Sequence, residues 1–149
     1  MKIKIEKMVY GGNGLGFHEG KAVFVPFVLP EEFVEVDLVK ERKDHSFGSL
    51  KKIITESPDR IESQCPNFTV CGGCDYLHVA YEKELQFKRS IIEDSLIRVG
   101  KLCPELIPEI DILASDRFFY RRVESHCRRD NLATLLRGGF GCRHPLPDA

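Results

Sequence analysis

Short apolar segments that alternate with polar residues fill the first sixty residues of the chain. The alternation is clear in "KIKIEKMVY" and "FVEVDLVKE", while "KAVFVPFVL" and "GSLKKIITES" are rich in β-branched and aromatic residues. Such segments are typical of strands, because successive side chains on a strand point to opposite faces. A set of four or five short strands in about sixty residues predicts a small closed β-barrel of the OB type.

Glycine punctuates the connection "YGGNGLGFHEGK", where "GGNGLG" superficially resembles a nucleotide-binding loop. A dinucleotide-binding loop follows a strand and opens a helix. Here the chain continues as a strand in "FHEGKAVFVPF". We therefore interpret these glycines as tight hairpin connections.

The apolar period becomes helical after residue 79, which predicts a helix over 79–100. Glu84 lies four residues before Lys88, the favourable orientation for an ion pair along a helix. Gly100 is well placed to terminate it. The apolar face expected for this helix comprises Tyr81, Leu85, Ile92, Leu96 and Val99.

Three of the six cysteines, Cys65, Cys71 and Cys74, lie within ten residues in "CPNFTVCGGC". The chain shows neither a signal-peptide pattern nor an apolar run that could cross a membrane, so we expect a cytoplasmic protein with reduced thiols. Clustered thiols then indicate a metal centre, and the spacing leaves iron–sulfur and zinc open. Candidates for a fourth ligand are Cys142, Cys127, Cys103 and His78.

Arginines concentrate between Arg117 and Arg143, where seven of them face only two acidic residues. A basic segment suits a phosphate backbone or, equally, a solvated surface. The candidate phosphate-contacting residues are Arg121, Arg122, Arg128 and Arg129. Aromatic candidates for stacking on RNA bases are Phe17, His18, Phe24 and Phe27, although we expect these side chains to be buried in the barrel core.

The segment "SPDRIESQCPNFTVCGGCDYLHVAYEKELQFKRSIIEDSLIRVG" resembles the Fe–S segment of the RNA uracil-5 methyltransferases, which make 5-methyluridine in rRNA or tRNA. The residues before it resemble the TRAM domain of these enzymes, an RNA-binding barrel of OB type. "RFFYRRVESHCRRDN" is similar to the start of their central domain. The turn Pro30-Glu31-Glu32 departs from the Pro-Gly-Glu that is usual there.

This resemblance implies a [4Fe–4S] cluster with Cys65, Cys71 and Cys74 as three ligands. Cys142 is taken as the fourth, although it follows the preceding strand more closely than the family's fourth cysteine does. In the family, S-adenosylmethionine binds a C-terminal doubly wound domain, and no motif of that domain follows residue 137. We therefore expect a truncated chain that binds RNA, does not bind S-adenosylmethionine, and is inactive alone.

The predicted fold is mainly β with one long helix. It comprises a TRAM barrel over 1–61, an Fe–S loop with its helix over 62–102, and the start of an α/β central domain over 103–149. Such an unfinished domain would expose strand edges and favour self-association. The alternative is a stand-alone zinc-binding nucleic-acid-binding module, with His78 as the fourth ligand.

Overall fold

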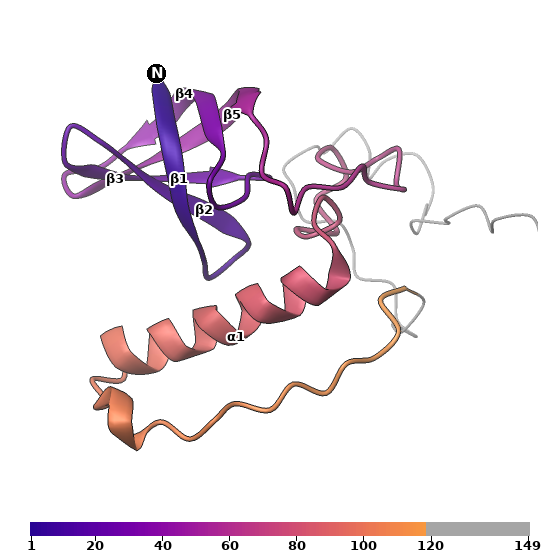
Figure 1. Cartoon of the computed structure of the whole chain (residues 1–149). Coiled ribbons are helices and arrows are strands. Elements are labelled where there is room, and N and C mark those ends of the chain that lie inside the picture. The colour runs from indigo at the N-terminus through magenta and orange to yellow at the C-terminus, as the bar shows by residue number, and fades with distance from the viewer. Residues whose placement is uncertain (119–149) are drawn as a thin grey trace, which may run out of the picture.

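The computed structural model describes residues 1–118 of the 149-residue chain. Five strands come first, followed by one long helix and a short 3-10 turn (Figure 1). These residues confirm the prediction of a mainly β fold with one long helix. The elements are β1 (Lys2–Val9), β2 (Asn13–His18), β3 (Lys21–Pro26), β4 (Phe33–Glu41), β5 (His45–Thr55), α1 (Tyr81–Arg98) and η1 (Pro104–Leu106).

The five strands form a closed barrel in the order β1-β2-β3-β5-β4, with β4 returning to β1. β3 and β5 pair in parallel, whereas all other neighbouring strands are antiparallel. Pairing of Ile3 with Val34 joins the last strand in this order to the first. Closure removes the free sheet edges that strands this short would otherwise expose. The predicted OB-like barrel is confirmed.

The strand β2 corrects the interpretation of the glycine-rich connection, because Asn13–His18 is a strand and not a turn. Two of its glycines face the crowded interior of the barrel. A Cβ atom on Gly14 would lie 2.4 Å from Val28 Cγ2, and one on Gly16 would lie 2.5 Å from the carbonyl oxygen of Lys4. Glycine is therefore required by close packing at these positions. Gly11, Gly12 and Gly20, with positive φ, do form the turns at either end.

Apolar side chains from alternate strand positions fill the barrel. Burial of each such side chain contributes roughly 1.5–3 kcal/mol to stability. Residue Val28 joins them from the connection after β3. The buried core consists of Ile3, Ile5, Val23, Val25, Val28, Val34 and Val36, with Met1, Leu50 and Ile53 packed at its edge.

Helix α1 packs below one end of the barrel through a second, smaller apolar cluster (Figure 1). Met8, Leu29 and Val79 are buried there, and Phe87 and Ile91 of the helix pack against them. The predicted apolar face was wrong for Ile92 and Val99, which are exposed, and it omitted Phe87 and Ile91, which carry the contact with the barrel. Its other members, Tyr81, Leu85 and Leu96, are half-buried.

The predicted ion pair between Glu84 and Lys88 is confirmed, with Oε1 and Nζ 2.6 Å apart. At the end of the helix the left-handed conformation is adopted by Lys101 (φ 57°) rather than by Gly100.

Beyond η1 the chain returns along α1 in an extended segment, drawn in orange in Figure 1. The hydroxyl of Tyr81 donates a hydrogen bond to the carbonyl oxygen of Ser115. Arg117 donates to the carbonyl oxygens of Tyr76 (2.7 Å) and Val79 (2.9 Å), and its Nη2 lies 3.0 Å from the Glu84 carboxylate. These contacts tether the segment to the beginning of the helix. Most of the α/β central domain expected over 103–149 lies outside the described residues.

Candidate functional site

The cysteine-rich loop leaves the barrel after β5 and reaches α1 through a series of tight turns. The amide of Phe68 donates to the Cys65 carbonyl oxygen (3.1 Å), and the amide of Cys71 donates to the Asn67 carbonyl oxygen (2.9 Å). Thr69 and Gly72 both have a φ of 73°. These turns fold the segment between the first and last cysteine back on itself.

The thiols of this loop lie near the surface: Cys65 and Cys71 are half-buried, and Cys74 is exposed. Within residues 1–118, no three histidine, cysteine, aspartate or glutamate side chains gather at a metal-binding arrangement. The donor chemistry nevertheless suits a soft metal, because thiolates are the ligands of iron–sulfur clusters and structural zinc. Cys103, another candidate fourth ligand, is exposed just before η1. Cys127 and Cys142 lie outside the described residues.

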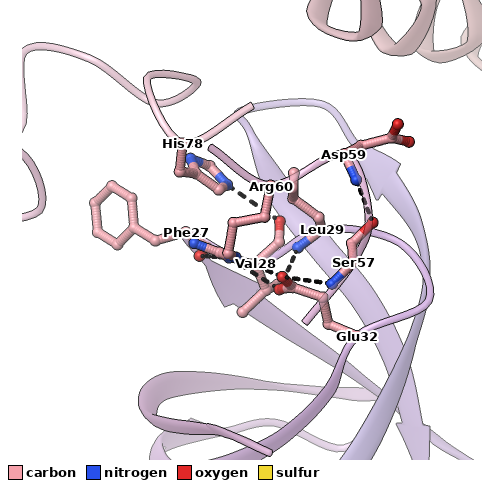
Figure 2. Close-up of polar contacts among 8 residues, drawn as sticks. All are labelled: Phe27, Val28, Leu29, Glu32, Ser57, Asp59, Arg60 and His78. Atoms are coloured by element: carbon pink, nitrogen blue, oxygen red, sulfur yellow. Dashed lines mark hydrogen bonds and ion pairs between the residues drawn. The ribbon is translucent and has the colours of Figure 1, made fainter. Parts of the chain in front are cut away.

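His78, the candidate zinc ligand, is buried between the loop and the barrel (Figure 2). Its Nε2 donates to the carbonyl oxygen of Val28 at 3.4 Å, and its ring stacks on Phe68 with centroids 5.4 Å apart. Its Nδ1 has no hydrogen-bond partner in the described part of the chain. Burial, assisted by the nearby charge of Arg60, lowers the pKa of His78 to about 4. The imidazole is therefore neutral at physiological pH.

Beneath His78, a buried ion pair fastens the loop to the barrel (Figure 2). Arg60 grips the Glu32 carboxylate with two nitrogens, at 2.5 and 2.9 Å, and also donates to the Phe27 carbonyl oxygen. The same carboxylate accepts hydrogen bonds from the amides of Leu29 (2.8 Å) and Ser57 (3.3 Å). A fully buried carboxylate is tolerated only with such complete pairing. The "SPDR" segment thus has a structural role at the base of the loop.

Next to this pair, Glu31 adopts a left-handed backbone conformation, with φ of 70°. Its amide donates to the Ile5 carbonyl oxygen at 2.9 Å, which holds the turn against β1. This is the position where the resembled family carries glycine, which adopts positive φ at no steric cost. The departure noted in the sequence therefore places a residue with a Cβ atom in a left-handed conformation.

The outer surface of the barrel carries aromatic side chains that were expected to be buried. Phe17 is exposed and Phe24 is half-buried. Phe27 is buried as expected, but against Phe68 and His78 and not in the barrel core. Sequence reasoning missed two further rings, His45 and Phe47, at the start of β5. The i, i+2 spacing of aromatic residues in "HSFGS" is the signal that identifies them, because residues two apart share one face of a strand. His18, at the end of β2, is half-buried.

The arginines predicted to contact phosphate, Arg121, Arg122, Arg128 and Arg129, lie outside the described residues. Basic residues that the structure does describe on the barrel include Lys40 on β4 and Arg42 and Lys43 in the turn that follows it; all three are exposed. No helix among residues 1–118 has the length and apolar character needed to cross a membrane.

Comparison with known proteins gives consistent matches. Residues 1–51 match the TRAM domain family. An uncharacterized RNA methyltransferase of Aquifex aeolicus is 42% identical over 121 residues, which is 81% of this chain and 28% of the relative. The 23S rRNA (uracil(1939)-C(5))-methyltransferase RlmD of Shewanella amazonensis is 34% identical over 134 residues, 90% of this chain and 28% of its own length. The chain thus spans little more than a quarter of these relatives.

Among solved structures, the tRNA (uracil-54, C5)-methyltransferase of Pyrococcus abyssi, in complex with S-adenosyl-L-homocysteine, is 26% identical. The match covers 63% of this chain and 21% of the other. Its TM-score of 0.44 is too low to bear on the fold.

Proposed function

Because this chain carries a TRAM domain and matches the RNA (uracil-5) methyltransferases over most of its length, we propose that it serves as the RNA-binding, iron–sulfur N-terminal part of such an enzyme. The observation that supports this most directly is the 34% identity to a 23S rRNA uracil methyltransferase over 134 residues. The closed barrel at residues 1–55 is the expected RNA-binding element. We accordingly place the protein in the cytoplasm.

We propose that RNA binding and catalysis lie in different parts of such an enzyme. The chain covers 28% of each of the two relatives described above. Uracil methylation through a covalent intermediate needs a nucleophile, a base and the methyl donor held together. We assign those tasks, and the binding of S-adenosylmethionine, to the part of the relatives beyond this match. The task that we propose for residues 1–149 is RNA binding.

For the metal centre we propose a [4Fe–4S] cluster held by Cys65, Cys71 and Cys74, with Cys142 as the fourth ligand. The three thiols in a tightly turned loop support this donor set, since such clusters are commonly held by four cysteine thiolates. The cluster would be structural, cross-linking the loop at the point where Arg60 fastens it to the barrel. The alternative, a zinc-binding module, uses His78 in place of Cys142, and its unpaired Nδ1 favours that ligand.

Metal content tests the two alternatives directly. We expect anaerobically purified chain to be brown, with roughly equal iron and inorganic sulfide. Cys71→Ser should lose the visible absorbance, whereas Cys103→Ser, the matched control on an exposed cysteine, should retain it. A colourless protein with one zinc, lost in His78→Asn, would establish the alternative centre.

RNA binding is tested separately, by fluorescence anisotropy with a labelled fragment of 23S rRNA and a DNA of the same sequence. We expect RNA to bind more tightly than DNA, with an affinity that falls as salt rises. Failure of the chain to bind RNA, or equal affinity for DNA, would contradict the proposed function.

A further inference from the structure

We propose that the outer face of β2, β3 and β5 is a platform on which unpaired RNA bases stack. It consists of Phe17, Phe24, His45 and Phe47, which we term the aromatic strip. The inference rests on the proposed function, because it names the part of the barrel that contacts RNA and the form of RNA that is bound.

The register of the strands places these side chains side by side. Phe24 on β3 is the pairing partner of Phe47 on β5. One step along, Ala22 pairs with His45 on one side and with Phe17 of β2 on the other. Because paired residues and residues two apart share a face, all four aromatic residues lie on one surface of the sheet.

Ring contacts join three of the four residues, Phe24, His45 and Phe47, into one cluster. The ring of Phe24 lies 5.7 Å from that of His45 and 5.5 Å from that of Phe47, and the His45 and Phe47 rings are 5.3 Å apart. Two of the three pairs are edge-to-face and the third is tilted, so the rings brace one another at fixed orientations. Because these contacts already fix the ring orientations, a ring loses less conformational entropy when a base stacks on it.

The strip lies on the surface, since Phe17 is 46% exposed and Phe47 is 38% exposed. Helix α1 packs elsewhere on the barrel, through Met8 of β1. Charge at the border of the strip fits a polyanion. Lys40 is the pairing partner of Phe47, and the turn that leads into His45 carries two exposed basic residues, Arg42 and Lys43, against one exposed carboxylate, Asp44. The nearby carboxylate of Glu41 is neutralised by Lys21 at 2.7 Å.

This combination favours single-stranded RNA over a duplex. Every base offers a flat face that stacks on an aromatic ring, and the backbone then runs past basic side chains. Bases in an RNA duplex are already stacked on one another and cannot reach a convex barrel surface. The sequence preference of such a platform is low, because ring stacking does not read hydrogen-bonding edges.

Tryptophan substitution provides a direct test, because the natural chain contains no tryptophan. Phe47→Trp places the only indole in the strip, and Phe33→Trp places it on β4 at an equally exposed site (39%) away from the strip. The probe is an oligouridine of about 12 nucleotides, within the range that one OB fold covers. We expect the oligouridine to quench the emission of Phe47→Trp and to leave that of Phe33→Trp unchanged.

Affinity measurements on the full chain complete the test. Phe47→Ala and the packing-conserving Phe47→Leu should bind oligouridine at least about fivefold more weakly, as expected when one stacked base is lost. Phe33→Ala should stay within about twofold of the natural chain. Lys40→Gln should reduce the slope of log K against log salt by about 0.7. Phe47→Leu retains apolar packing, so a loss in that variant reports stacking rather than misfolding.

The outcomes separate this inference from the proposed function. RNA binding that is unaffected by Phe47→Leu, with no quenching in Phe47→Trp, would overturn the platform while leaving RNA binding by the chain intact. A duplex that binds as tightly as the single strand would overturn it as well. If neither the rRNA fragment nor oligouridine binds, both proposals fail.

Discussion

Ionisable side chains are buried where the cysteine-rich loop meets the barrel. Glu32 and His78 are almost completely buried, and Arg60 joins them from the loop. The Glu32 carboxylate there has to be matched by a partner, since a buried charge without one is costly. The junction is therefore sensitive to single substitutions and to pH, although it contains no residue proposed to contact RNA.

Substitution Arg60→Ala should be among the most destabilising changes in the barrel region. It removes the cation that faces the Glu32 carboxylate and leaves that charge buried with only two backbone amides. We expect a loss of about 3 kcal/mol or more in the free energy of unfolding, measured by urea denaturation. The control Lys83→Ala, which breaks an ion pair with the neighbouring Asp59, should change stability by less than about 0.5 kcal/mol. A loss for Arg60→Ala as small as that of the control would show that the pair does not hold the junction.

The stability of the chain should fall between pH 6.5 and pH 4 because of His78. Burial lowers the pKa of this residue in the folded state to about 4, whereas an unfolded histidine titrates near 6.5. Between these two pH values the unfolded state binds a proton that the folded state does not. The free energy of unfolding that neutral His78 contributes above pH 6.5 is therefore lost as the pH falls, by up to about 3 kcal/mol.

Melting temperatures of the natural chain and of His78→Phe, measured from pH 7 to pH 4, check this expectation. The substitution removes the titrating group and keeps an aromatic ring beside Phe68. We expect the melting temperature to decrease more for the natural chain than for the variant as the pH falls from 7 to 4. Parallel curves would mean that His78 does not titrate differently in the folded and unfolded states.

At the scale of elements, the strained turn between β3 and β4 is the feature most open to improvement. Glu31→Gly should raise the melting temperature, because a left-handed conformation costs a residue with a Cβ atom about 1–2 kcal/mol, more than glycine loses in chain entropy. The free energy of unfolding should increase by about 0.5–1 kcal/mol. The same change at Glu6, within β1, should instead destabilise by a similar amount. A lower melting temperature for Glu31→Gly would show that the glutamate side chain stabilises the turn.

Elements that depend on local pattern were predictable from the sequence, and those that depend on neighbours were not. Alternation located β1, β3, β4 and most of β5, and helical spacing located α1 within two residues at each end. β2 was missed because its glycines are required by close packing against Val28 and Lys4, and only the closed barrel brings these residues near.

A similar reason explains why the apolar face of α1 was predicted wrongly and why the buried ion pair of Arg60 with Glu32 was not predicted. Both are set by the surface that the segment meets, which periodicity does not reveal. The aromatic strip was half predicted: Phe17 and Phe24 were singled out, but their exposure depends on which face of the sheet the barrel turns outward.

At the scale of the whole molecule, two apolar clusters of unequal size hold the described residues together. The larger fills the barrel, while the smaller joins the barrel to α1 and the loop. Much of the helix surface beyond Phe87 and Ile91 is exposed, including Ile92 and Ile97. The helix therefore has much less apolar burial than the barrel, and regions of lower burial open more readily.

Hydrogen exchange should show this inequality. We expect the amides of α1 to exchange at least about tenfold faster than the slowest amides of the barrel strands. Met8→Ala, which removes the central side chain of the smaller cluster, should accelerate α1 most, whereas Ile5→Val in the barrel should accelerate the strands and leave α1 nearly unchanged. If α1 and the strands exchange at the same rate in all three proteins, the two clusters unfold as one unit.

The order in which the strands pair also has a consequence for synthesis. β1, β2 and β3 are successive antiparallel neighbours, so they can pair as soon as each is made. The barrel cannot close until β5 is complete, because β5 is the strand that joins β3 to β4. While the ribosome makes residues 27–55, the nascent chain presents an open sheet with two unpaired edges, which has three strands until β4 pairs with β1 and four strands after that. Variants that slow translation through this interval should therefore aggregate during synthesis even when the finished protein is stable.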